Sequence, residues 1–167
     1  MKIKEINFNT IEDIWISQKD MWYEKSFINP IQDNLYWDGL DYIGGKNKLI
    51  NSFNYSNPCY YACFLSDEIV GVNSFFKAND EQCRSRGLYV FPEYRNKGIS
   101  KILLNYAIEK NKNKNYKFIW SMPRKEALQS YESVGFYKTS NFFSYSPDRG
   151  MKMISGYENC YARFDFQ

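Results

Sequence analysis

The segment from residue 83 to residue 122 constrains the fold of this chain more than any other part of the sequence. It begins with a strand at Cys83–Phe91, which Pro92 ends because proline has no N–H to donate to a β-ladder. Gly98 then opens an amphipathic helix, and an apolar strand follows at Tyr116–Met122. Two strands joined through a helix in this way form a parallel pair with a right-handed crossover. The sequence therefore predicts a sheet that contains a parallel strand pair.

The remaining elements place this pair in a mixed sheet. Thr10 is typical of a helix N-cap, and apolar residues at helical spacing predict a helix from about Ile11 to Tyr23. We predict further strands at Lys2–Phe8, Cys59–Leu65 and Ile69–Lys77, a short helix over Arg124–Val134, and strands Phe136–Tyr145 and Tyr157–Phe166 around a turn at 147–150. Tight turns between successive strands favour an antiparallel meander before the crossover. The expected fold is α+β (α/β mixed), with one domain over residues 1–167 and helices on the faces of its sheet.

Composition excludes several kinds of chemistry. The chain has no histidine, which excludes Ser-His and Cys-His catalysis and histidine-containing metal sites. Its four cysteines lack the paired spacing of a zinc site, so we expect structural thiols and no metal. A net charge of +3 is too small to indicate nucleic-acid binding. The N-terminus has no signal-like apolar core and no apolar run spans a bilayer, so we expect a cytoplasmic protein without a membrane partner.

A basic loop after the first parallel strand is the best candidate for a ligand site. The first turn of the following helix has unpaired N–H groups and a partial positive charge, which together bind phosphate groups. Gly98 removes a side chain where the backbone would approach such a ligand, and Arg95 and Lys97 add positive charge. On these residues alone, an ordinary strand-to-helix turn is the more common explanation. The residues concerned are Arg95, Asn96, Lys97, Gly98, Ile99 and Ser100.

Two motifs in this region resemble those of the GNAT N-acetyltransferases. The run from Leu88 to Leu104 contains Pro-Glu-Tyr-Arg-Asn-Lys-Gly-Ile-Ser, where the family has Pro-x-Tyr-Arg-x-x-Gly-x-Gly/Ala before an amphipathic helix. The run from Ala127 to Phe136 resembles the family's Ala-x-x-x-Tyr-x-x-x-Gly-Phe. The chain departs from the family at Ser100, where Gly or Ala is usual, and at Arg124, where many members have Asn. Two motifs in the family's order are more specific than either alone.

The resemblance implies an enzyme that moves an acetyl group from acetyl-CoA to an amine. It implies a central, mostly antiparallel sheet with helices on both faces, in which the two parallel strands splay apart around the pantetheine arm. The loop Arg95–Ser100 would then hold the pyrophosphate. The backbone of Leu88, Tyr89 and Val90 would bind pantetheine, and the Val90 N–H would stabilise the oxyanion. Tyr131 matches the family's general acid, which protonates the departing thiolate, and packing against the cofactor is its alternative role.

The general base has no support from either motif. Without histidine, carboxylates are the side chains that remain for this role, and Glu81, Glu93 and Glu132 lie nearest in sequence to the strand and to Tyr131. A chain of water molecules ending at backbone carbonyls is the alternative. Arg124 is expected to reach either a cofactor phosphate or the acceptor, because arginine cannot accept a hydrogen bond as asparagine does.

The acceptor is expected to be a small-molecule amine or a peptide amine. Asp33, Asp38 and Asp41 are candidates to counter a cationic amine, or are surface residues. Aromatic side chains either line the acceptor pocket or serve the core and subunit contacts, a homodimer included. They are Trp15, Trp22, Tyr23, Tyr36, Trp37, Tyr42, Phe142, Phe143, Tyr145 and Tyr157. Two other functions stay open, namely an acyl-CoA-binding module without turnover and a nucleic-acid or tRNA-directed acetyltransferase, which the net charge of +3 disfavours.

Overall fold

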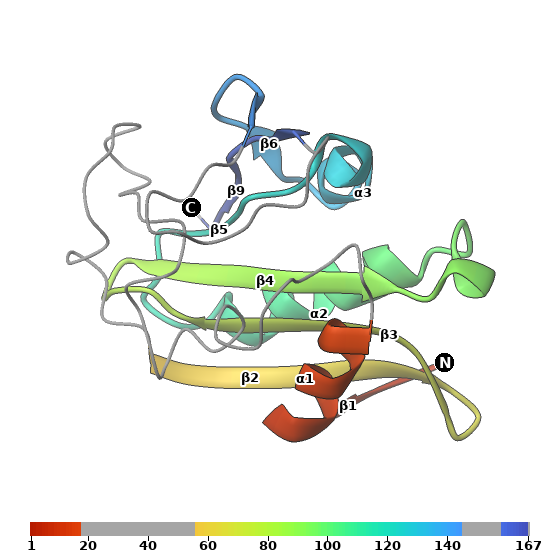
Figure 1. The fold of residues 1–167 in the computed structure, drawn as a ribbon. Helices are drawn as coiled ribbons and strands as arrows, with labels where there is room; N and C mark the ends of the chain where they lie inside the picture. Colours follow the sequence, from red (N-terminus) through yellow and green to blue (C-terminus); the bar gives the residue numbers. More distant parts are fainter. Residues whose placement is uncertain (18–55, 145–157, 167) are drawn as a thin grey trace.

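The computed structural model describes residues 1–17, 56–144 and 158–166 of the chain. Within these residues the main sheet has seven strands in the order β1-β2-β3-β4-β5-β9-β6, and β7 pairs with β8 in a second sheet (Figure 1). The strands are β1 (Lys2–Glu5), β2 (Ser56–Leu65), β3 (Glu68–Lys77), β4 (Gln82–Val90), β5 (Phe118–Ser121), β6 (Tyr137–Lys138), β7 (Phe143–Ser144), β8 (Glu158–Asn159) and β9 (Ala162–Asp165). The α-helices are α1 (Phe8–Ser17), α2 (Ile99–Asn111) and α3 (Leu128–Glu132), and the 3-10 helices are η4 (Pro92–Tyr94) and η5 (Lys125–Ala127).

The main sheet is mixed and mostly antiparallel, as predicted. β1 to β4 pair in sequence as an antiparallel meander. β4 and β5 then form the predicted parallel pair, joined through α2. β9 adds to β5 and β6 adds to β9, both antiparallel. The helix between the parallel strands therefore lies at the centre of the fold, behind the sheet in Figure 1.

Helices pack on both faces of the sheet. α2 covers one face, where Ile99 and Leu103 are buried against Gly71 of β3, and a side chain at Gly71 would press on both. α1 lies on the opposite face, in front of the sheet in Figure 1. There Ile11 and Trp15 pack in a second cluster of buried apolar residues. The alternation of side chains along the strands thus separates an α1 face from an α2 face.

The first strand and helix differ from their predicted limits. The predicted strand Lys2–Phe8 is present but ends at Glu5, and α1 begins at Phe8, so the predicted end of the strand and the predicted N-cap at Thr10 are wrong. Asn7 caps the helix instead, because its Oδ1 accepts hydrogen bonds from the N–H of Thr10 (2.8 Å) and from the Thr10 hydroxyl (2.9 Å). Asn and Thr are both good caps, and the helix takes the earlier one. The predicted end of this helix lies outside the described residues.

The predicted C-terminal strands are each divided in the structure. The segment predicted as Phe136–Tyr145 contributes β6 to the main sheet and β7 to the second sheet. Between them the backbone turns at Ser140, whose Oγ accepts a hydrogen bond from the N–H of Tyr161 (2.8 Å). The segment Tyr157–Phe166 divides likewise into β8 and β9, and the turn predicted at 147–150 lies outside the described residues. The helix predicted over Arg124–Val134 is divided into η5 and α3, and α3 ends at Glu132, before a turn that Gly135 (φ 104°) closes.

A bulge in β4 is held by the first helix. Between the pairs Val72↔Tyr89 and Ser74↔Arg86 the register shifts, so that Gly87 and Leu88 of β4 oppose one residue of β3. Gly87 has φ 82°, and the Nε1 of Trp15 donates a hydrogen bond to its carbonyl oxygen (2.8 Å). A Cβ atom at Gly87 would lie 2.1 Å from the Trp15 ring. The indole therefore packs where only glycine leaves room.

We predict that Trp15→Phe lowers the free energy of unfolding by about 1–3 kcal/mol, because the carbonyl of Gly87 loses its donor in a partly buried place. Urea denaturation followed by circular dichroism measures the change. Gly87→Ala should cost more, since its Cβ would overlap the indole and its φ disfavours a side chain. An unchanged denaturation midpoint in Trp15→Phe would show that the indole is not what holds the bulge.

Candidate functional site

The parallel strands separate soon after they begin to pair. β4 pairs with β5 from Gln82↔Phe118 to Arg84↔Trp120, and β4 then continues to Val90 without this neighbour. At the point of separation the Ser121 hydroxyl donates a hydrogen bond to the carbonyl oxygen of Ser85 (2.9 Å). A side-chain hydrogen bond thus takes the place of the next backbone hydrogen bond between β4 and β5. From these two serines the backbones diverge toward the end of β4 that carries the basic loop (Figure 1), and we call the space between them the gap, with its narrow end at the serines and its wide end at the loop.

The backbone of β4 presents polar groups to this gap. Phe91 donates its N–H to the carbonyl oxygen of Val70 (3.1 Å), so Val90 and Gly71 form a non-hydrogen-bonded antiparallel pair. In such a pair the N–H and C=O point away from the partner strand, and those of Val90 therefore point toward the gap. Backbone N–H and C=O groups alternate in direction along a strand. Those of Leu88 therefore also point toward the gap, and those of Tyr89 point toward β3.

The basic loop ends in an open helix N-terminus. Asn96 (φ 61°) and Gly98 (φ 79°) both adopt left-handed backbone conformations, and α2 starts directly afterwards. The first hydrogen bond of the helix runs from the N–H of Ile102 to Gly98 (3.2 Å), so the N–H groups before Ile102 have no intrahelical acceptor. A Cβ atom at Gly98 would meet no atom within 4 Å. These observations fit a phosphate group, which such N–H groups bind.

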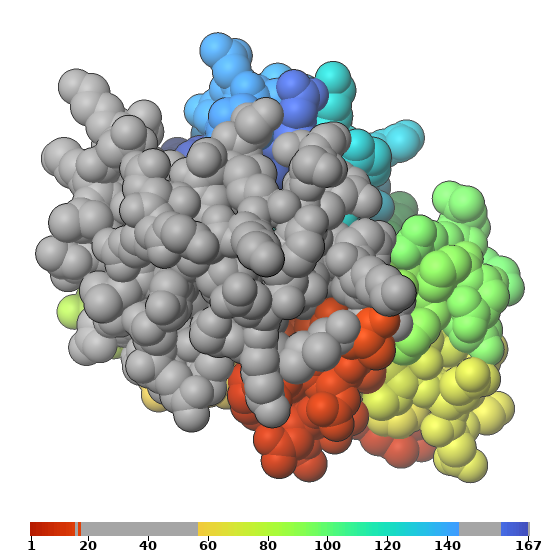
Figure 2. Space-filling view, viewed as in Figure 1, coloured from red at the N-terminus to blue at the C-terminus, as the bar shows by residue number. Residues whose placement is uncertain are grey.

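Side-chain contacts hold the loop in place. The Tyr94 hydroxyl donates to Glu68 of β3 (2.8 Å), which explains why the loop (green) lies beside the β2–β3 turn (yellow) in Figure 2. The Nε of Arg95 donates to the carbonyl oxygen of Val90 (2.9 Å), while Arg95, Asn96 and Lys97 remain exposed. Ser100 Oγ lies 3.2 Å from Ser130 Oγ, which links the start of α2 to α3. The loop and α3 therefore border the same gap.

Tyr131 lies at the narrow end of the gap. Its phenol is buried, and its oxygen lies 3.2 Å from the Ser121 hydroxyl that also contacts Ser85. Burial raises the pKa of Tyr131 above its ordinary value, while the hydrogen bond that the phenol shares with Ser121 and the positive charge of Arg84 act in the opposite direction. The phenol therefore stays protonated near neutral pH and can donate a proton at this position.

The comparisons identify the family. A sequence model of the "Acetyltransferase (GNAT) family" matches residues 13–136, which is most of the chain. This chain is a GNAT acetyltransferase. The family uses acetyl-CoA, and its members are acyltransferases. The two motifs that resemble the family thus lie within, or at the end of, the region that its sequence model matches.

Solved structures of GNAT enzymes share the fold. The ribosomal-protein-S18-alanine N-acetyltransferase from Escherichia coli is 14% identical, with a TM-score of 0.64 over 99% of this chain and 94% of that chain. An IAA acetyltransferase from Bacillus cereus ATCC 14579 is 14% identical, with a TM-score of 0.65 and 98% of each chain covered. An aminoglycoside 6'-N-acetyltransferase complexed with coenzyme A is 11% identical, with a TM-score of 0.63 over 100% of this chain and 98% of that chain. No curated protein matches the sequence.

The structure brings together most of the residues that the GNAT resemblance selects. Leu88 and Val90 border the gap, Arg95–Ser100 form the loop at its wide end, and Tyr131 closes its narrow end. Sequence reasoning missed Ser121, because a serine at the end of an apolar strand carries no signal by itself. It also missed the arginines of β4, although two charged residues in a buried strand are a signal that could have found them.

The proposed carboxylate bases are exposed. Glu81 forms an ion pair with Lys117 (2.7 Å), and Glu93 and Glu132 are exposed as well. The backbone of Arg124, beside η5, forms an isolated antiparallel β-bridge with Asn159. Among the residues that the structure describes, no group of three or more potential metal ligands lies close together. None of the described helices is long and apolar enough to span a membrane.

Three of the residues predicted to line the acceptor pocket lie in the described part of the chain, and the others lie outside it. Trp15 belongs to the core against β4, and Phe143 packs against Tyr161, with ring centroids 5.3 Å apart. Phe142 lies under the Lys138 ammonium, 4.2 Å from its ring centroid. The other candidates lie outside the described residues: Trp22, Tyr23, Tyr36, Trp37, Tyr42, Tyr145, Tyr157, Asp33, Asp38 and Asp41.

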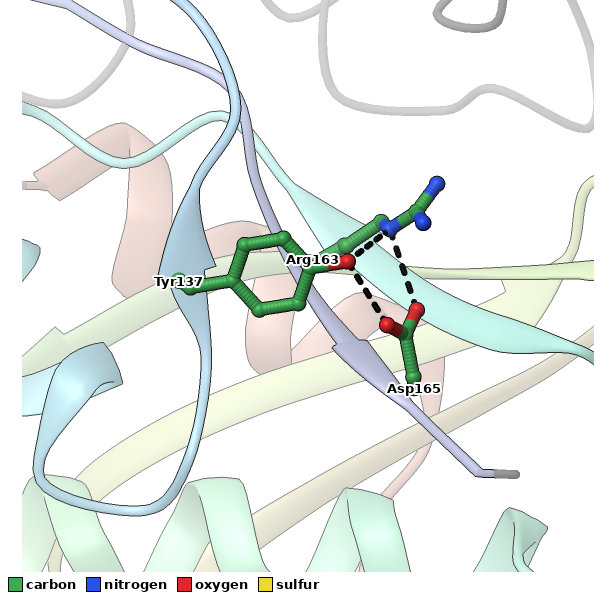
Figure 3. A network of polar contacts seen from close by, with 3 residues as sticks. All are labelled: Tyr137, Arg163 and Asp165. Carbon is green, nitrogen blue, oxygen red and sulfur yellow. Dashed lines mark hydrogen bonds and ion pairs between the residues drawn. The ribbon is translucent and has the colours of Figure 1, made fainter.

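A polar network braces the strands beyond β5. The Tyr137 hydroxyl donates to Asp165 (2.6 Å) and accepts from the Nε of Arg163 (2.6 Å), which is also 3.0 Å from Asp165 (Figure 3). The Arg163 guanidinium additionally lies 4.6 Å from the centroid of the Phe118 ring in β5. This network joins β6, β9 and β5, and so supports the strand that forms one wall of the gap.

We predict that stability falls in alkaline solution. Burial raises the pKa of the Cys83 thiol and of the Tyr61 and Tyr131 phenols, whereas in the unfolded chain these groups titrate at about 8.5 and about 10. Above about pH 9 the unfolded state therefore binds fewer protons than the native state, and the free energy of unfolding decreases as pH rises. Each group contributes up to about 1.4 kcal/mol per pH unit.

Urea denaturation with a reductant between about pH 8 and pH 11 measures this dependence. In Tyr131→Phe, which lacks one of the buried phenols, the decrease above about pH 10 should be shallower. A free energy of unfolding that stays constant over this range would contradict the predicted titrations.

Proposed function

We propose that this GNAT chain is an N-acetyltransferase in which an amine directly attacks acetyl-CoA in a ternary complex. The observation that carries the proposal is the gap between β4 and β5, which has an open helix N-terminus at its wide end and a buried phenol at its narrow end. We further propose that residues 1–167 act as a single catalytic domain in the cytoplasm, with a small-molecule amine or a peptide amine as acceptor.

The proposed binding mode for acetyl-CoA uses mainly backbone groups. The segment Leu88-Tyr89-Val90 lines the pantetheine arm. The N–H and C=O of Leu88 and the second lone pair of the Val90 carbonyl, which also accepts from Arg95 Nε, make the hydrogen bonds, and the Val90 N–H is left for the thioester. The pyrophosphate binds the N–H groups at the start of α2, with Gly98, Ile99 and Ser100 closest and Asn96 forming the preceding turn. Arg95 and Lys97 add charge from the exposed side of the loop.

The proposed chemistry needs two donors, namely a hydrogen-bond donor to the carbonyl oxygen of the thioester and a proton donor to its sulfur. The amine nitrogen forms a bond to the carbonyl carbon, and the Val90 N–H stabilises the negative charge that develops on the carbonyl oxygen. The C–S bond then breaks, and Tyr131 donates its proton to the departing thiolate. Solvent returns a proton to the phenol after the products leave. The hydrogen bond between Ser121 and Ser85 keeps the phenol oxygen at the point where the strands part.

The acceptor must lose a proton before it attacks. Glu81 is engaged with Lys117, and Glu93 and Glu132 are exposed, which disfavours all three as a direct base. We therefore propose that water accepts this proton, in contact with the backbone carbonyls along the open edge of β4.

Gly98→Glu should abolish binding of acetyl-CoA, because its carboxylate would meet the pyrophosphate. Isothermal calorimetry measures the affinity. Gly98→Ala is the matched control, since it shares the strained φ of 79° without the charge, and its Cβ has open space. We expect the alanine variant to bind acetyl-CoA. Unchanged affinity in a folded glutamate variant would contradict the assignment of the loop.

Tyr131→Phe should lower turnover by about 10²–10⁴-fold while acetyl-CoA still binds, if the phenol is the general acid. The measurement is release of free CoA at saturating acetyl-CoA and amine. Tyr137→Phe, which removes an exposed phenol on β6, should leave turnover unchanged. Equal rates for Tyr131→Phe and the parent chain would remove Tyr131 from the catalytic residues. Binding without CoA release from any amine would instead identify an acyl-CoA-binding module.

A further inference from the structure

The hydroxyl of Ser121 contacts two oxygen atoms but carries a single hydrogen. Its Oγ lies 2.9 Å from the carbonyl oxygen of Ser85 and 3.2 Å from the phenol oxygen of Tyr131. A carbonyl oxygen can only accept a hydrogen bond, whereas a hydroxyl can both donate and accept. When Ser121 donates to Ser85, the phenol must therefore be the donor in its contact with Ser121.

The same three groups allow a second arrangement. If the Ser121 hydroxyl turns about its Cβ–Oγ bond, it donates to the phenol oxygen, and the phenol is free to donate its own proton elsewhere. Hydroxyl hydrogens rotate in this way to suit their partners. No heavy atom needs to move, because Oγ already lies within 3.2 Å of both acceptors.

Burial makes the hydrogen-bond partner of this phenol important. Ser121 and Tyr131 each have an exposed fraction of 3%. Among the residues that the structure describes, Ser121 is the one hydrogen-bond partner of the Tyr131 hydroxyl. A phenol that gives up its proton here becomes a buried anion, which is strongly unfavourable without a hydrogen bond. Burial raises the pKa of this phenol, and the hydrogen bond with Ser121 lowers it, as does the charge of Arg84 on β4.

The two hydroxyl groups are positioned by separate elements. Ser121 pairs with Ala162 of β9, on the side of β5 away from the gap. The Tyr131 ring packs edge-on against Phe136, with ring centroids 5.2 Å apart, and the N–H of Phe136 donates to the carbonyl oxygen of Tyr131 (3.1 Å). The oxygens are therefore held by β5 and by α3, and the hydroxyl hydrogens are the parts that can reorient.

We propose that Ser121 is a positioning residue that supports the general acid in two successive arrangements of one turnover. The inference rests on the proposed function and adds a residue to it. Before the reaction, Ser121 donates to Ser85 and accepts the hydrogen bond of the Tyr131 phenol, which keeps the phenol in place.

The second arrangement forms as the proton leaves. The O–H bond of Tyr131 breaks, an S–H bond forms on the departing CoA, and the electron pair stays on the phenolate oxygen. The Ser121 hydrogen then turns from the carbonyl oxygen of Ser85 to the phenolate, with its own O–H bond intact. When solvent returns a proton to the phenolate, Ser121 donates to Ser85 again.

Two variants of equal shape test this role. Ser121→Val replaces the hydroxyl by a methyl group, and Ser121→Thr has the same branched shape but keeps the hydroxyl. The assay is release of free CoA at saturating acetyl-CoA and amine, with the fastest acceptor among polyamines, aminoglycosides, amino acids and short peptides. We expect kcat of Ser121→Val to lie about 10- to 100-fold below that of Ser121→Thr, as for a lost hydrogen bond to a charged group. The KM for the amine and the calorimetric affinity for acetyl-CoA should agree between them.

The same comparison in the Tyr131→Phe background separates this role from a structural one. If Ser121 acts through the phenol, Ser121→Val and Ser121→Thr should then have equal kcat, because no phenolate forms. If Ser121 only holds β5 against β4 through Ser85, Ser121→Val should lower kcat by the same factor in both backgrounds.

A second pair of variants covers the case that branched side chains do not fit at this buried position. Ser121→Ala removes the hydroxyl without adding volume, and it should lower kcat by about 10- to 100-fold. Ser133→Ala is the matched control. Ser133 is exposed after α3 and donates to the carbonyl oxygen of Ser130 (2.6 Å), so the same kind of hydrogen bond is lost outside the gap, and kcat should not change. Thermal unfolding followed by circular dichroism shows that each variant is folded.

The outcomes separate this inference from the proposed function. A parent chain that releases no CoA with any amine overturns the proposed function and the inference together. With an active parent chain, equal kcat for Ser121→Val and Ser121→Thr, or for Ser121→Ala and Ser133→Ala, overturns the inference alone. A difference between Ser121→Val and Ser121→Thr that persists in the Tyr131→Phe background also overturns it.

Discussion

The early end of hydrogen bonding between β4 and β5 is the constraint on which the rest of the site depends. A parallel ladder that continued to Val90 would occupy the backbone groups of β4 and leave no gap. Instead, the Ser121 hydroxyl takes the place of the next rung, and the bulge at Gly87 changes the register of β4 against β3. Trp15 holds this bulge through the Gly87 carbonyl. The first helix therefore helps to determine how the gap in the sheet is shaped.

The proposed acetyl-CoA site consists mainly of backbone groups. The groups assigned to acetyl-CoA are N–H and C=O groups of β4 and of the start of α2, which any sequence provides once the fold is correct. On the other face of β4, the side chains of Gln82, Arg84 and Arg86 are buried.

Local patterns predicted the centre of the fold better than its ends. Pro92 and Gly98 set the limits of their elements through backbone chemistry that acts within a few residues. At the N-terminus, Asn7 and Thr10 are both residues that favour the helix N-cap, and the local sequence does not decide which of them caps α1. At the C-terminus, the strands divide because β6 and β7 pair with different partners, β9 and β8, that lie far along the chain.

The sequence by itself determined the strand–loop–helix–strand unit and the position of the basic loop, because each is encoded in consecutive residues. The proposal of Tyr131 came from the resemblance of residues 127–136 to the GNAT family. Only the tertiary structure decided that Ser121 contacts Tyr131 where β4 and β5 separate, and that Trp15 packs on Gly87. It also decided that the arginines of β4 lie on the face of the sheet that α2 does not cover. These contacts join residues distant in the chain. Their partners are selected by sheet order and register, which depend on the packing of the whole domain rather than on any local preference.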